Sequence, residues 1–142
     1  RVDAPDADVP MRAETAALLR AHRRALAAAL RRVRSAADVA AAHRARIAGK
    51  RLRYLLEPLR GDRGVARVVA RLRTLQDRLG EFHDAQLLRD RLVAEGAPGI
   101  AARAEQEGAR AFAAFRRSWS RARAAAYLRL VDAEIGRLGR GA

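Results

Sequence analysis

The chain has 142 residues, contains no cysteine, and sets thirty Lys and Arg residues against sixteen Asp and Glu residues, for a formal net charge of +14. A chain of this length is expected to fold as one domain around a single hydrophobic core. The lack of cysteine excludes disulfides, thiolate metal ligands and thiol nucleophiles, and the lack of a long apolar run predicts that no segment spans a membrane.

The predicted elements follow from helical periodicity, which runs through almost the whole sequence. Residues 1–9, with Pro5 and three Asp residues, are predicted to form an extended leader, and residues 10–142 a single helical domain. Within that domain apolar side chains recur every three or four residues, which indicates helices with one buried face. The predicted helices are residues 11–34, 39–59, 63–95, 100 to about 124, and a short tail helix after residue 126.

Breakers and caps mark the ends of these helices. Gly61 ends the second helix, Asp62 is placed to cap the third, and Gly96 ends the third. No alternating run of β-branched and aromatic residues predicts a strand. We therefore expect an all-α fold, an antiparallel four-helix bundle with a short extra C-terminal helix.

Nearly all of the positive charge is carried by arginine, since Lys50 is the only lysine. A net charge of this size destabilises the folded chain by self-repulsion, which a polyanionic partner relieves. The guanidinium group is planar, stays ionised and matches the geometry of phosphate oxygens. A coding bias toward arginine explains Arg in place of Lys, but it does not explain an excess of fourteen positive charges. The composition therefore predicts a polyanion-binding protein.

The second predicted helix carries the most informative pattern. His43, Arg46, Lys50 and Arg53 project from it within an arc of about 80° and extend over roughly 15 Å. Like charges at these spacings destabilise an isolated helix, so the row has no intrachain benefit unless carboxylates or a ligand face it. The alternative interpretation is an ordinary solvated basic face. We take the row as the main candidate for anion binding.

Arginine rows are also predicted on the first and third helices, each within a similar arc. If all three rows adjoin, they form a groove suited to a flexible polyanion. The candidate binding residues taken from these two helices are Arg20, Arg24, Arg31 and Arg71.

A polar stretch interrupts the third helix. Gly80 is disfavoured inside a helix by up to ~1 kcal/mol relative to Ala, which predicts the close approach of a neighbouring helix. Gln76, Asp77 and Asp84 are placed to orient arginine side chains of that neighbour beneath a phosphate site. His83 beside these carboxylates lacks a second His at helical spacing, so no metal site and no cofactor are predicted.

The two stretches together resemble the CHAD family, the conserved histidine α-helical domain. The matching positions are His43, Arg46, Ile47, Lys50, Arg51, Leu52, Arg53 and Tyr54, followed by Leu75, Gln76, Asp77, Leu79, Gly80 and Asp84. The resemblance implies an all-α domain that binds inorganic polyphosphate through basic side chains on its helices, with contact roles for the row on the second helix. It also implies a cytoplasmic location, at polyphosphate bodies or storage granules.

The chain departs from the family in one respect. CHAD domains resemble two four-helix halves related by a pseudo-two-fold axis, and this sequence contains only one such half. A homodimer would rebuild the two-fold arrangement.

Other classes of function are less well supported by the sequence. An enzyme is not expected, because there is no Gly-rich phosphate loop, no acidic cluster and no Gly-x-Ser-x-Gly motif. The alternative ligand is a nucleic acid, since any phosphate backbone binds such a charge with release of counterions. Against it, the aromatic residues, Tyr54 among them, lie at core-like spacings, so no stacking platform is predicted. A docking module would need an exposed apolar stripe, for which the tail after Ala126 is the candidate.

Overall fold

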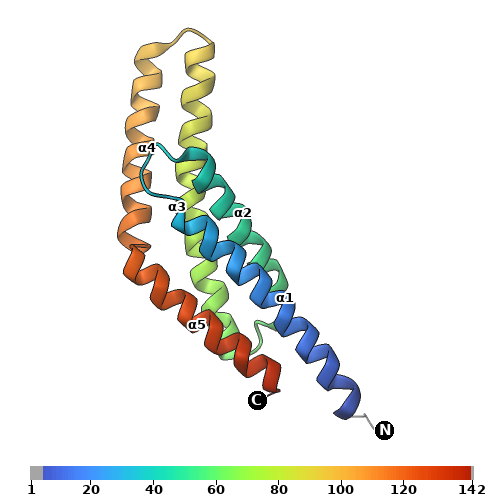
Figure 1. Ribbon diagram of the computed structural model, residues 1–142. Coiled ribbons are helices and arrows are strands. Elements are labelled where there is room, and N and C mark those ends of the chain that lie inside the picture. The colour runs from blue at the N-terminus through green and yellow to red at the C-terminus, as the bar shows by residue number, and fades with distance from the viewer. Residues whose placement is uncertain (1–4, 142) are drawn as a thin grey trace.

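The computed structural model describes the backbone of residues 5–141 and the side chains of residues 12–141, and this part of the chain consists of helices joined by short loops, without strands (Figure 1). The predicted all-α class is therefore confirmed. The helices are α1 (Pro5–Arg31), α2 (Val39–Leu56), the short 3-10 helix η1 (Glu57–Leu59), α3 (Arg63–Ala94), α4 (Pro98–Ser118) and α5 (Arg121–Arg140).

The helices pack in a ring with one projecting hairpin. α1 contacts α2 and α5, while α3 contacts α2 and α5, so these four segments enclose a common core. α4 packs mainly along α3, and the hairpin of α3 and α4 extends beyond the ends of α1 and α2 (Figure 1). The predicted bundle of four helices with a short tail helix is not confirmed. The predicted fourth helix, α4, packs along α3, whereas α5 packs against α1.

The break between α4 and α5 lies at Trp119 and Ser120, earlier than the predicted break at residues 124–126. The tail helix is therefore 20 residues long, and not short as predicted. Ser120 Oγ accepts a hydrogen bond from the Arg123 amide at 3.2 Å and caps α5. The break was predicted at a run of alanines. Alanine has the highest helix propensity of any residue type, so this run continues the helix.

The N-terminal prediction also needs correction. Helix α1 begins at Pro5, so the extended leader is wrong for residues 5–9, and residues 1–4 lie outside the described part of the chain. Proline has a fixed φ and no amide hydrogen, both of which suit the first turn of a helix. The predicted start of α3 is confirmed, since Asp62 Oδ1 accepts hydrogen bonds from the amides of Gly64 and Val65.

The core is apolar and confirms the predicted stripes. Leu26, Leu52, Leu72 and Leu75 are completely buried where α1, α2 and α3 meet. Burial of apolar surface on this scale is the dominant stabilising contribution in a helical domain. Among the described residues, no helix combines the length and the apolar character that a membrane span requires.

Candidate anion-binding site

The basic row of α2 faces the polar stretch of α3. The imidazole of His43 stacks on that of His83, with ring centroids 4.3 Å apart and planes 18° from parallel. One turn further along, Arg46 crosses α3 at Gly80, where a Cβ atom would lie 3.3 Å from Arg46 Nε. The group near Gly80 is therefore the end of the Arg46 side chain, and not the backbone of a neighbouring helix as the predicted close approach implied.

One end of the row is fixed by hydrogen bonds. Arg53 Nε donates to Gln76 Oε1, as predicted for a residue that orients an arginine, and Arg53 Nη1 donates to Glu57 Oε2 at 2.6 Å. Arg60 and Arg73 also donate to the Glu57 carboxylate, each at 2.9 Å. The Arg53 guanidinium is the main cause of a pKa of Glu57 below its usual range. Three guanidinium groups share one carboxylate, so this end of the row stays positively charged.

Tyr54 departs from the sequence-based expectation. It was placed at a core-like spacing, yet its side chain is 54% exposed. Its ring contacts two members of the row, with Lys50 Nζ 5.6 Å and Arg53 Cζ 4.9 Å from the ring centroid. Cations over an aromatic face are held by the ring quadrupole. Tyr54 therefore positions the two cations at the surface and does not contribute to the core.

Two buried polar atoms of the row have no hydrogen-bond partner among the described residues: His43 Nδ1 and Arg46 Nε. A buried polar group without a partner costs about 1–3 kcal/mol, which a suitable ligand atom or a water would recover. Burial, followed by the charges of His83 and Arg46, lowers the pKa of His43 from its ordinary value. The lowered pKa favours the neutral form of His43 in the free protein, whereas an anion beside it would favour the protonated form.

The arginine ridge of α1 does not join this row. Ala21, Ala25 and Ala29 form the edge of α1 that faces α2. Arg31 instead lines a cleft with Arg121 and other residues of α4 and α5. Arg20 and Arg24 project from α1 in nearly the same direction as Arg31, so the three arginines follow the edge of α1 beside α5.

The candidates on α3 are also divided. The Arg71 guanidinium lies over the rings of Trp119 and Tyr127, on the side of α3 that faces α5. Asp77 and Asp84 are exposed and form no hydrogen bond or ion pair with any described residue. Of the three predicted orienting residues, only the glutamine contacts an arginine of the row.

Sequence reasoning missed a second basic surface on α2. His22, Arg44 and Arg51 line a groove of about 460 Å³ between α1 and α2, with alanine side chains along its floor. Arg44 and Arg51 are seven residues apart, so they lie on one face of α2 after two turns. The sequence contains that spacing, but two arginines form a weaker pattern than the four basic residues of the row, which lie on another face of α2.

The model of the CHAD domain family matches residues 1–93. The chain belongs to the CHAD family. The match spans α1, α2 and nearly all of α3, so it includes the basic row and the positions that face it. No curated protein and no solved structure matches this CHAD chain. Over its described residues, the domain has no group of three or more His, Asp or Glu side chains able to hold a metal ion.

Proposed function

We propose that this CHAD domain binds inorganic polyphosphate along the basic row of α2 and catalyses no reaction. The observation that carries the proposal is the row itself. Four basic side chains follow one edge of α2 along α3, and three of them, His43, Arg46 and Lys50, form no ion pair with a carboxylate among the described residues. The CHAD family is associated with polyphosphate binding in general, which agrees with this surface.

The shape of the row favours a long ligand over a single ion. Its members extend over roughly 15 Å of helix, so a chain with negative charge on every unit can contact several of them at once. After the first contact the remaining ones are intramolecular, which raises the affinity well above that for a single phosphate. Long-chain polyphosphate should therefore stabilise the domain at far lower phosphate concentration than orthophosphate.

The members of the row have different roles in this proposal. Arg53 already donates to Gln76 and Glu57. Its main contribution is therefore a positive charge held in a fixed position, and it has few free donors for the ligand. Arg46 and Lys50 have uncommitted donors and are the main contact residues. Arg46 presents a planar fork, whereas Lys50 presents a compact ammonium group at the exposed edge.

Single-stranded nucleic acid is the second candidate ligand, and the exposure of Tyr54 favours it. An exposed aromatic ring beside two cations is a stacking position for one base. A nucleic-acid surface normally repeats such positions along the strand, and among the Phe, Tyr and Trp rings of the described residues only that of Tyr54 lies against a cation of the row. Replacing Tyr54 with Leu should weaken RNA binding strongly and polyphosphate binding slightly.

A competition titration tests the proposal. Polyphosphate, duplex DNA and single-stranded RNA are compared at equal phosphate concentration and near-physiological salt. We expect polyphosphate to displace both nucleic acids. Displacement of polyphosphate by RNA at equal phosphate would assign the surface to nucleic acid instead.

A further inference from the structure

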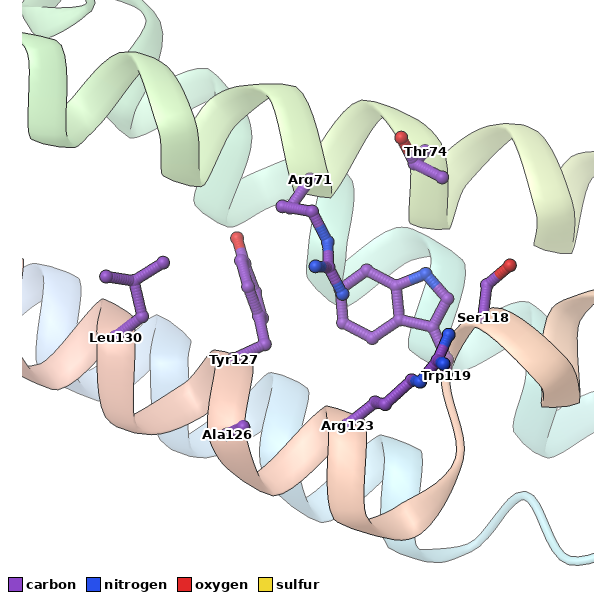
Figure 2. A pocket seen from close by; sticks show the side chains of 8 residues that line it. All are labelled: Arg71, Thr74, Ser118, Trp119, Arg123, Ala126, Tyr127 and Leu130. Carbon is purple, nitrogen blue, oxygen red and sulfur yellow. The ribbon is translucent and has the colours of Figure 1, made fainter.

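A further concave, basic site lies on the other side of α3 from the row, where α3, the end of α4 and the beginning of α5 meet (Figure 2). It is a cleft of about 540 Å³ lined by two arginines, two hydroxyl residues, two aromatic residues and two aliphatic ones. Arg71, which lines it, is nine residues before Gly80, a rotation of about 180° around α3. The cleft and the row share no residue.

The cleft concentrates positive charge without a compensating carboxylate. Figure 2 shows Arg71 reaching from α3 and Arg123 from α5, both toward the indole of Trp119. The Arg71 Cζ atom lies 4.9 Å from the Trp119 ring centroid, and Arg123 Nη1 donates to the carbonyl of Arg117 at 3.2 Å. No acidic residue is among the eight described residues that line the cleft. Two guanidinium groups therefore face the same space with most of their donors uncommitted.

The cleft also borders one buried neutral donor, the indole N–H of Trp119. Trp119 is only 1% exposed, and its Nε1 has no hydrogen-bond partner among the described residues. Figure 2 shows this nitrogen on the edge of the indole that faces α3. The hydroxyl of Ser118, at the rim, also forms no hydrogen bond with described residues. A buried donor without a partner is unfavourable, and Trp119 Nε1 is such a donor beside two guanidinium groups.

The other polar groups of the cleft are already committed. The Tyr127 hydroxyl donates to the carbonyl of Val68 at 2.7 Å, and the Thr74 hydroxyl donates to that of Ala70 at 3.2 Å. Burial raises the pKa of Tyr127 well above its ordinary value, so its phenol stays protonated and adds no negative charge. Both of these hydroxyls have used their donor, so the uncommitted donors of the cleft belong mainly to the Arg71 and Arg123 guanidinium groups.

We infer that this cleft binds one phosphoryl group, either free inorganic phosphate or the end of a phosphate chain. A tetrahedral phosphate presents mainly acceptor oxygens, and these match the two guanidinium forks that lie beside the indole. A planar aromatic ligand is a poorer fit, because the Arg71 guanidinium already covers the exposed side of the aromatic pair. The inference does not rest on polyphosphate binding by the row on α2.

The protein carries its own reporter for this site, since Trp119 is its only tryptophan. The full chain is titrated with inorganic phosphate and, separately, with tripolyphosphate, with sodium chloride as a control for ionic strength. Trp119 fluorescence and the single indole N–H signal in the nitrogen-correlated NMR spectrum are followed. We expect a saturable fluorescence change and a downfield shift of the indole proton. Saturation by phosphate identifies the free ion as ligand, and saturation by tripolyphosphate alone identifies a chain end.

Two variants localise the effect. Arg123→Ala should weaken the response about tenfold or more, because a charge-assisted contact is lost. Arg129→Ala removes the same charge from an exposed position of α5 outside the cleft and should leave the response unchanged. Circular dichroism checks that both variants are folded.

Three results would overturn the inference. The first is an indole signal that neither ligand moves in the unmodified protein, a measurement that needs no variant. The second is an equal loss in Arg123→Ala and Arg129→Ala, which would indicate general charge screening. The third is loss of the phosphate response in the double variant Arg46→Ala, Lys50→Ala, which would place the event in the row. Survival of the response in that double variant keeps this cleft and the proposed polyphosphate site distinguishable.

Discussion

Replacement of Gly80 with Ala should stabilise the domain and weaken polyphosphate binding at the same time. The new Cβ atom would lie 3.3 Å from Nε, 3.8 Å from Nη2 and 4.0 Å from Cζ of Arg46. These atoms belong to the far end of a flexible side chain, so they can move by a few tenths of an ångström. Ala is favoured over Gly inside a helix by up to ~1 kcal/mol, which for a domain of this size raises the melting temperature by about 3 °C.

Binding should weaken because the Arg46 guanidinium shifts by a few tenths of an ångström from its position against α3. Gly136→Ala on α5 is a matched control, since its Cβ would meet the end of another arginine, Arg140 Nη1, at 3.2 Å, away from the row. Thermal melts by circular dichroism and polyphosphate titrations of both variants are compared with the unmodified chain. Both should melt higher, and only Gly80→Ala should lose affinity. A stabilised Gly80→Ala variant with unchanged affinity would refute a binding role for the position of Arg46.

Other predictions concern charge and pH. The folded-state pKa of His43 lies below its ordinary value of 6.5, so its contribution to stability is complete above about pH 6.5 and is lost as the pH falls below it. The stabilisation by polyphosphate should grow over the same fall, because the ligand favours the protonated ring, and His43→Gln should flatten this dependence of the ligand-induced melting shift. The contribution of Glu57 is present above its unfolded pKa and lost as the pH falls through the lowered folded value. Glu57→Gln should therefore lower the melting temperature at neutral pH while tightening polyphosphate binding, and a looser complex would contradict its role as a carboxylate that neutralises part of the charge at the Arg53 end of the row. In the double variant Arg46→Ala, Lys50→Ala, the slope of log affinity against log salt should fall by about one to two, and an unchanged slope would place the contacts elsewhere.

The helices and their caps could be predicted because their signals are local. The apolar stripe of each helix, the cap at Asp62 and the glycine opposite Arg46 all depend on residues within a few turns. The row on α2 could be predicted for the same reason, since spacing alone places its members on one ridge. The contact between Arg53 and Gln76 could be predicted because polar side chains inside an amphipathic helix need polar partners, and the basic row of α2 supplies them.

The relations between helices could not be predicted in this way. Helical periodicity shows which side chains lie on the same face of one helix, but it does not show which other helix that face contacts. The ridges of Arg31 and Arg71 therefore lie beside α5 and not beside the row. The exposure of Tyr54 and the break at Trp119 likewise depend on tertiary packing, which overrides local propensity. The cleft around Trp119 joins residues of three helices that are far apart in sequence, and no local pattern marks it. The homodimer expected from the half-domain character of the sequence stays a prediction.

The most direct test of a polyphosphate site on α2 is a calorimetric titration of long-chain polyphosphate into three proteins at near-physiological salt. They are the unmodified chain, the double variant Arg46→Ala, Lys50→Ala, and the double variant Arg103→Ala, Arg129→Ala, which removes the same charge from exposed positions on α4 and α5. We predict that the first double variant loses at least about tenfold in affinity and the second very little. Equal losses in the two would show that polyphosphate responds to net charge alone, and the row would then have no special role.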